Sequence, residues 1–288
     1  MPTPKPPAAV ITVLNLKGGV GKTHACWLLA SVAEERGQRI LLVDTDPQGN
    51  LSNSFLRERE GLPGVEQLLD PSLDVDGLRL IQRTAYEHID IIPSTPKIAG
   101  FDEANQREWE RTELHRSFGP LIRAASALYD IIVFDCPPRL SLTSFAALCA
   151  SDYVVVPLEA ADWGAQGVAA VTEAVDYVAA SFNPRLRLLG YLISRFRRGR
   201  KYQMTYWTGM REHFGPLVFD TSIDDLAAFE RSVTDAVPIT RHSPRSAAAE
   251  IARRFYDEAL GRAEEHRRSG EGRIRENDHA TRVVAARR

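Results

Sequence analysis

The sequence predicts an α/β fold with a doubly wound, mainly parallel sheet. Three observations indicate this fold: a glycine-rich turn directly after a short apolar run, further apolar runs of strand length, and helical stretches between most of them. Strands that alternate with helices are typical of a parallel sheet that helices cover on both faces. With 288 residues and 44% hydrophobic content, the chain can bury a full core. We therefore expect a soluble globular protein.

The first predicted unit is a strand, a loop and a helix. Residues 10–15 form a β-branched run that ends in the glycine-rich turn, and the Ala, Leu and Trp positions of residues 22–36 suit a buried helix. Gly37 is expected to close this helix, because glycine readily adopts the left-handed conformation found after helix ends. The next strand, residues 39–44, is mostly apolar, as parallel strands buried on both faces are.

The same pattern recurs along the rest of the chain. Strands are expected at residues 89–93, 129–135, 152–157, 186–193 and, as a short late strand, 216–220. A final helix is expected from about residue 246 to residue 265. Because no Gly/Ser/Pro linker divides the chain, we expect one domain over residues 10–265, a flexible segment over residues 1–9 and a disordered basic tail over residues 266–288.

Composition excludes several classes of protein. The 36 basic and 38 acidic residues nearly balance, so a polyanionic partner would have to bind a local patch. The three cysteines form no C-x-x-C pair and leave an odd thiol, which favours a reducing compartment over a disulfide framework or an iron-sulfur site. The sequence has no signal-peptide core and no apolar run near the ~20 residues that a membrane helix needs. A cytoplasmic protein without a membrane role is expected.

The glycine-rich turn predicts a phosphate-binding loop of a P-loop NTPase. The general pattern is G-x-x-x-x-G-K-[ST], in which backbone N–H groups hold phosphates, the lysine neutralises their charge and the hydroxyl binds Mg²⁺. Gly21, Lys22 and Thr23 fit, whereas Leu16 replaces the first glycine. A chance turn is the alternative interpretation, but the loop has the required strand before it and helix after it. The candidate nucleotide-binding residues are Lys17, Gly18, Gly19, Val20, Gly21, Lys22, Thr23 and His24.

Carboxylates follow two of the predicted strands. Asp44 and Asp46 end the second strand, and Asp135 ends the strand at residues 129–135. Ligands of doubly wound sheets bind at such carboxyl ends. We expect Thr23 and Asp135 to bind Mg²⁺, Asp135 directly or through water, and Asp44 and Asp46 to position the attacking water. Each aspartate alone is more often a cap or turn residue.

Three motifs in this order carry a family resemblance. They are K-G-G-V-G-K-T at residues 17–23, L-L-V-D-T-D-P-Q-G-N at residues 41–50 and Y-D-I-I-V-F-D-C-P-P at residues 129–138. Together they resemble the ParA/MinD family of deviant Walker A ATPases, most closely its ParA (Soj-like) branch. The likeness covers roughly residues 10–260.

The resemblance implies ATP and Mg²⁺ as cofactors and an ATP-dependent homodimer. In this family Lys17 would be the signature lysine that reaches across the dimer, and Asp46 would activate water with Asp44 beside it. Relatives bind nonspecific DNA as ATP dimers, and a ParB-like or other cargo adaptor stimulates slow hydrolysis. The implied function is partition or positioning of a plasmid, chromosome or other cargo, with nucleoid association in the ATP-bound form.

One basic cluster could contact DNA. Charged and aromatic residues are interleaved between residues 195 and 211, and the candidate DNA-binding residues are Arg195, Arg197, Arg198, Arg200 and Lys201. A solvated loop is the alternative interpretation, because charge runs are usually no more than that.

Two departures from the family pattern bear on function. His24 stands where a second Ser or Thr is usual, and residues 222–229 replace a usual Ile-Pro-Arg and place Ala228 at a DNA-contacting Arg position. Two alternative functions therefore stay open. One is an accessory ATPase of conjugation, secretion or polysaccharide export that docks on proteins. The other is a P-loop ligase of the dethiobiotin-synthetase type that acts on a small molecule.

Overall fold

The computed structural model describes residues 6–101, 113–160 and 165–269, with no side chains described for residues 165–167. β1 begins at Ala9 and Ala8 is buried, so part of the segment expected to be flexible belongs to the core. The last helix continues to Arg268, beyond the expected boundary at residue 265. The rest of the expected N-terminal segment and of the tail lies outside the described residues.

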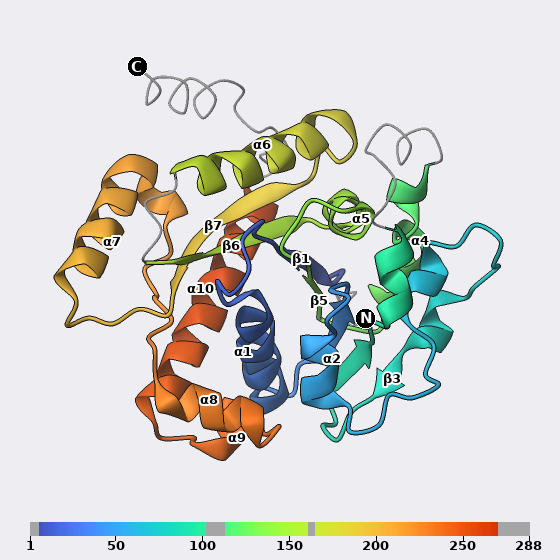
Figure 1. Ribbon diagram of the computed structural model, residues 1–288, viewed down its shortest axis with the longest axis horizontal. Coiled ribbons are helices and arrows are strands. Elements are labelled where there is room, and N and C mark those ends of the chain that lie inside the picture. The colour runs from blue at the N-terminus through green and yellow to red at the C-terminus, as the bar shows by residue number, and fades with distance from the viewer. Residues whose placement is uncertain (1–5, 102–112, 161–164, 270–288) are drawn as a thin grey trace, which may run out of the picture.

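A single sheet organises the described chain (Figure 1). Its strand order is β3-β4-β2-β5-β1-β6-β7, and all neighbours are parallel except β3 and β4. The strands are β1 (Ala9–Val13), β2 (Ile40–Asp44), β3 (Gln82–Arg83), β4 (Ile89–Ile92), β5 (Ile131–Asp135), β6 (Tyr153–Glu159) and β7 (Arg187–Ser194). The predicted doubly wound, mainly parallel sheet is confirmed.

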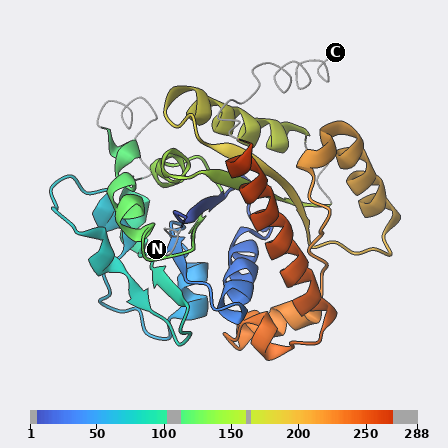
Figure 2. The same cartoon turned by 180° about the vertical axis from the view of Figure 1, so that it is seen from behind.

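Helices cover both faces of this sheet (Figures 1 and 2). On one face lie α4 (Gly119–Ala125), α5 (Leu142–Ala150), α6 (Ala165–Ser181) and α7 (Lys201–Phe214). On the other lie α1 (Lys22–Glu35), α2 (Asn50–Phe55), α8 (Ala227–Thr234), α9 (Ile239–His242) and α10 (Ala247–Arg268). Short 3-10 helices span Val65–Leu68, Gly77–Leu80, Pro96–Phe101, Leu114–Arg116 and Gly215–Leu217.

The two faces have separate hydrophobic cores, because alternate residues of a strand point to opposite sides. In β1, Val10 belongs to the core beneath α4 to α7, whereas Ile11 and Val13 belong to the core beneath α1 and α10. α1 is apolar around most of its circumference and is buried between the sheet and α10. This packing holds the start of α1 in a fixed place at the end of β1.

The predicted late strand at residues 216–220 was wrong. Gly215 adopts a positive φ of 53° and is the first residue of a 3-10 turn that extends to Leu217. Pro216 has no N–H to donate to a strand ladder. What remains is one bridge between Tyr191 and Val218, with a hydrogen bond from Phe219 N–H to Tyr191 O (3.0 Å).

No helix within the described ranges combines the length and the apolar character that a membrane span requires.

Candidate functional site

The predicted site residues meet where three neighbouring strands end. β5 lies between β1 and β2, and its last residue, Asp135, is in register with Val13 on one side and Asp44 on the other. The loop after β1, the turn after β2 and the end of β5 therefore share one edge of the sheet. In doubly wound folds this is the edge at which ligands bind.

The loop after β1 has a shape that depends on glycine. Gly19 and Gly21 adopt φ values of 76° and 89°, a region that side chains disfavour. A Cβ atom on Gly21 would also lie 3.3 Å from Ser194 Oγ. Gly21 is the N-cap of α1 and has no side chain that could cap the helix. The first turn of this 14-residue helix therefore opens directly onto the loop.

Hydrogen bonds of Ser194 and Asn15 hold the loop against two other strands, β7 and β6. Ser194, the last residue of β7, donates its hydroxyl to Val20 O (2.5 Å). Asn15 donates its amide to Pro157 O (2.7 Å) and accepts a hydrogen bond from Lys17 N–H (2.9 Å). These contacts hold the loop from both sides, while Lys17 is exposed at its tip. Sequence reasoning did not identify Ser194 or Asn15, because their role appears only when the strand ends come together.

Lys22 lies inside the loop. It is 7% exposed, and its ammonium donates to Lys17 O (2.9 Å). Burial lowers the pKa of this ammonium, and the negative charge of Asp135 opposes that shift. The structure therefore holds the Lys22 ammonium against the backbone of the loop, where the P-loop pattern places the lysine that neutralises a phosphate.

Thr23 and Asp135 form a direct contact below the loop. The Thr23 hydroxyl donates to Asp135 Oδ2 (2.7 Å), whereas the buried Asp135 Oδ1 has no hydrogen-bond partner among the described residues. Burial, followed by the charge of Asp44, raises the pKa of Asp135 well above its usual range. An unsatisfied carboxylate oxygen beside a hydroxyl suits Mg²⁺, which is commonly held by one or two carboxylates together with substrate phosphates. The residues present thus fit the metal.

Asp44 and Asp46 occupy different environments. Asp44 is fully buried, and its two oxygens accept hydrogen bonds from Asp46 N–H (3.1 Å), Ser52 N–H (2.8 Å) and Ser52 Oγ (2.6 Å). Burial raises its pKa to about 6. Asp46 accepts a hydrogen bond from Gln48 N–H (2.9 Å) at Oδ1. The contacts of Asp44 fix the turn that carries Asp46, so of the two carboxylates Asp46 is better placed to meet a ligand.

His24 lies against α8. Its ring makes an edge-to-face contact with Phe229, with ring centroids 4.7 Å apart. Burial lowers the pKa of His24 to about 4, so the ring is neutral at pH 7. Its Nε2 atom is buried and lacks a hydrogen-bond partner within the described part of the chain. The structure thus joins the two departures noted in the sequence, since His24 contacts the segment at residues 222–229.

The basic loop, residues 195–201, adjoins the phosphate-binding loop. Arg195 has a positive φ of 51° and donates to Gly19 O (3.5 Å). Arg197 and Arg198 pair with two acids that sequence reasoning did not connect with them, Asp225 and Asp224. The other two candidate residues lie at the end of the loop. The Arg200 guanidinium donates to Tyr202, and Lys201 begins α7. The five candidate DNA-contacting residues therefore lie together, with part of their charge compensated.

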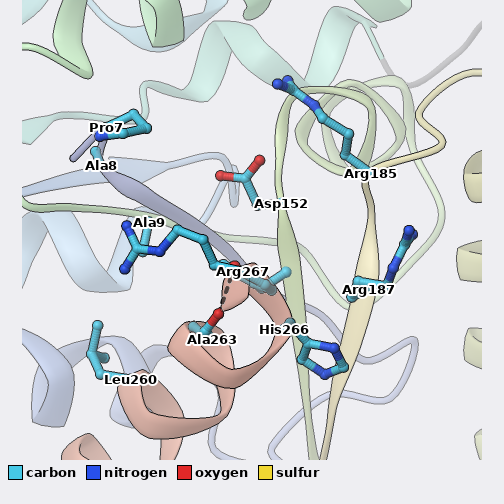
Figure 3. Close-up of a pocket in the computed structure, with 11 residues that line it drawn as sticks. Pro7, Ala8, Ala9, Asp152, Arg185, Arg187, Leu260, Ala263, His266 and Arg267 are labelled. Atoms are coloured by element: carbon cyan, nitrogen blue, oxygen red, sulfur yellow. Dashed lines mark hydrogen bonds between the residues drawn. The ribbon is translucent and has the colours of Figure 1, made fainter. Parts of the chain in front are cut away.

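A cavity of about 310 Å³ lies elsewhere, at the amino ends of β1, β6 and β7 (Figure 3). Its charged side chains do not converge, since Asp152, Arg185 and Arg187 point in different directions in Figure 3. Asp152 accepts a hydrogen bond from Val10 N–H (3.3 Å), and Arg187 donates to two backbone carbonyls. These polar groups stabilise the fold. The candidate nucleotide site lies at the opposite edge of the sheet, where β1, β2 and β5 end.

Comparison with known proteins identifies a matching family and similar ATPases. Residues 8–188 match a family described as an AAA domain. The chain is 34% identical to the chromosome-partitioning ATPase Soj of Thermus thermophilus over 88% of this chain and 96% of that protein. It is 31% identical to the sporulation initiation inhibitor protein Soj of Bacillus subtilis over 84% of this chain and 94% of that protein.

A solved structure is also similar. Cobyrinic acid a,c-diamide synthase from Mycobacterium smegmatis, with a bound ATP analogue and magnesium, superposes with a TM-score of 0.75 and 26% identity. The match covers 91% of this chain and 97% of that chain.

Proposed function

The chain belongs to the ParA/MinD family of P-loop ATPases, and on that premise we propose that it is an ATP-dependent dimerising switch that partitions or positions cargo. The observation that carries the proposal is the contact between Thr23 and Asp135 beneath a loop that holds Lys22. The cargo would be a plasmid, a chromosome or another assembly. The protein would be cytoplasmic, with nucleoid association in its ATP-bound form.

The nucleotide site would work through charge and position. The loop backbone and Lys22 would bind the phosphates of ATP, and Thr23 and Asp135 would hold Mg²⁺. Bound Mg²⁺ would offset negative charge on the phosphates. Asp46 would orient the attacking water, and Asp44 would hold the Asp46 turn in place. Hydrolysis would be slow until an adaptor protein stimulates it.

Lys17 would act across the dimer. It is exposed at the loop tip, whereas Lys22 is buried in the same loop. Lys22 would therefore contact the nucleotide of its own chain, and Lys17 would contact the nucleotide of a second copy. The dimer would form only with ATP, because the shared phosphates attract both copies.

Replacement of Lys17 by alanine is expected to spare ATP binding and to prevent the dimer. The variant keeps the backbone carbonyl that Lys22 contacts and loses the side chain of an exposed residue. Light scattering after size-exclusion chromatography, with a slowly hydrolysed ATP analogue and Mg²⁺, should report a monomer. The exposed Lys97 provides the control, since Lys97→Ala should dimerise as the wild type does. Normal dimerisation of the Lys17 variant would remove this residue from the interface.

DNA binding would depend on the nucleotide because the two loops touch. Ser194 and Arg195 contact Val20 and Gly19, so a change in the phosphate-binding loop would reach the basic loop directly. The decisive experiment measures nonspecific DNA binding with ADP, ATP and a slowly hydrolysed analogue at two salt concentrations, with dimerisation followed in parallel. Equal DNA retention with ADP and ATP would rule out the proposed switch.

Removing the charges of the basic loop is expected to weaken DNA binding. In a variant with alanine at residues 197, 198, 200 and 201, the salt slope of log K should become shallower, by about 0.9 for each phosphate contact that is lost. Fluorescence anisotropy over a salt series measures this slope. An unchanged slope would show that DNA, if bound, contacts another surface.

Two other functions each have an observation in their favour. The likeness to cobyrinic acid a,c-diamide synthase favours a small-molecule ligase, which rapid ATP turnover with a carboxylate substrate, without DNA or adaptor, would identify. The acidic residues paired with the basic loop favour an accessory ATPase that docks on proteins. ATP-dependent dimers that ignore DNA would support that second alternative.

A further inference from the structure

An acidic pair faces the basic loop. Arg197 Nε lies 2.6 Å from Asp225 Oδ2, and Arg198 Nε lies 3.0 Å from Asp224 Oδ2. Two of the five candidate DNA-contacting cations therefore each carry a carboxylate partner of their own. An arginine whose charge is already offset by a carboxylate neutralises less of a phosphate's charge, so its contact releases fewer of the counterions that surround DNA.

The backbone, and not only the ion pairs, places these acids beside the loop. Phe196 N–H donates to Ile223 O (3.0 Å), and Asp225 N–H donates to Phe196 O (2.9 Å). Asp224 also accepts a hydrogen bond from the Ser222 hydroxyl (2.9 Å). The carboxylates would therefore stay close to the loop even if the arginine side chains turned toward another ligand.

The partners differ in exposure. The side chains of Arg197 and Arg198 are 52% and 56% exposed, whereas those of Asp225 and Asp224 are 19% and 16% exposed. The arginines can thus reach a ligand on the surface while the acids remain behind them. A phosphate that approached the arginines would compete with both carboxylates and would be repelled by them.

We propose that Asp224 and Asp225 are built-in counter-charges that limit the affinity of the basic loop for a polyanion such as duplex DNA. The inference rests on the proposed DNA binding and specifies what limits the affinity of that binding. The loop would bind DNA weakly in one copy of the chain. Stable binding would require the second copy of the loop that an ATP-dependent dimer brings to the same duplex.

The test replaces both acids in the full-length protein. Asp224→Asn with Asp225→Asn removes two charges but keeps the size of the side chains and an oxygen that can accept from Ser222. With labelled duplex DNA of arbitrary sequence, we expect dissociation constants on the order of tenfold lower, and a salt slope of log K steeper by up to about 1.8 for two released arginines. The gain should also appear in the ADP-bound form, because both ion pairs lie within a single copy of the chain.

A matched control separates the local effect from net charge. Asp235 and Asp257 are also acids paired with basic side chains, His242 and Arg36, but they lie on other parts of the chain. Replacing both by asparagine changes the net charge equally and should leave the salt slope unchanged. A third variant adds Arg197→Ala and Arg198→Ala to the Asp224/Asp225 double variant and should lose the gain. Equal binding by the Asp224/Asp225 variant and the control would overturn the inference.

Elution from heparin separates this inference from the proposed function. If the wild type bound no DNA with any nucleotide, the proposed DNA switch would fail, but heparin would still report the charge that the loop presents. Later elution of the Asp224/Asp225 variant than of the Asp235/Asp257 control would then support the counter-charges. Elution of the two at the same salt concentration would overturn them.

Discussion

Replacement of Lys22 by alanine is expected to abolish nucleotide binding. The Lys22 ammonium is the buried positive charge of the phosphate-binding loop, and it is held there by Lys17 O. Hydrogen bonds to charged groups contribute about 1.5–3 kcal/mol each, and every 1.4 kcal/mol is about a factor of ten in affinity. Because the ammonium would contact more than one phosphate oxygen, we expect affinity for Mg-ATP to fall by a factor on the order of 100 or more. Isothermal titration calorimetry measures the loss.

The neighbouring lysine provides the control for this result. Lys17→Ala should bind Mg-ATP as tightly as the wild type in a monomer, since its ammonium is exposed rather than buried in the loop. Thermal melting without nucleotide should show that the Lys22 variant is folded, because Val20 O still accepts from Ser194 and Lys17 N–H still donates to Asn15. A Lys22 variant that is folded and binds ATP normally would contradict the assignment of the loop.

The sequence was sufficient for the features that depend on local pattern. The glycine-rich turn between a β-branched run and a helix predicted the loop, and carboxylates at strand ends predicted the edge at which Asp44, Asp46 and Asp135 meet. These predictions succeed because parallel strands all end on the same side and because the alternation of strand and helix is visible in one dimension.

The sequence was insufficient where partners are far apart in the chain. Ser194 supports a loop that lies 174 residues earlier, and Asp225 pairs with an arginine 28 residues before it. His24 and Phe229 were noted only as separate departures from the family pattern, although their rings touch. No periodicity marks such contacts, since each depends on which strand ends become neighbours in the sheet. The late strand failed for a related reason: its apolar residues pack in the core, but the turn at Gly215 and Pro216 limits its pairing.

Replacement of Asp46 by alanine is expected to trap the ATP dimer. The phosphate contacts of Lys22 and the Thr23–Asp135 pair stay intact in this variant, so ATP should still bind and the dimer should still form. Hydrolysis should slow by about 100-fold or more, since a positioned general base typically contributes 10²–10⁴-fold. Phosphate release under single-turnover conditions measures the rate, and light scattering follows the lifetime of the dimer.

An Asp44 variant tests whether this interpretation of Asp46 is correct. Its oxygens are bound to Ser52 and to the backbone of Asp46, so Asp44→Asn should loosen the turn and lower the melting temperature, with a smaller loss of hydrolysis. Asp46→Ala should leave the melting temperature nearly unchanged, because this side chain makes one hydrogen bond within the turn. The two variants therefore distinguish a residue that acts on water, Asp46, from a residue that holds the Asp46 turn in place, Asp44. Unchanged turnover in the Asp46 variant, together with loss of turnover in a folded Asp44 variant, would exchange the two roles.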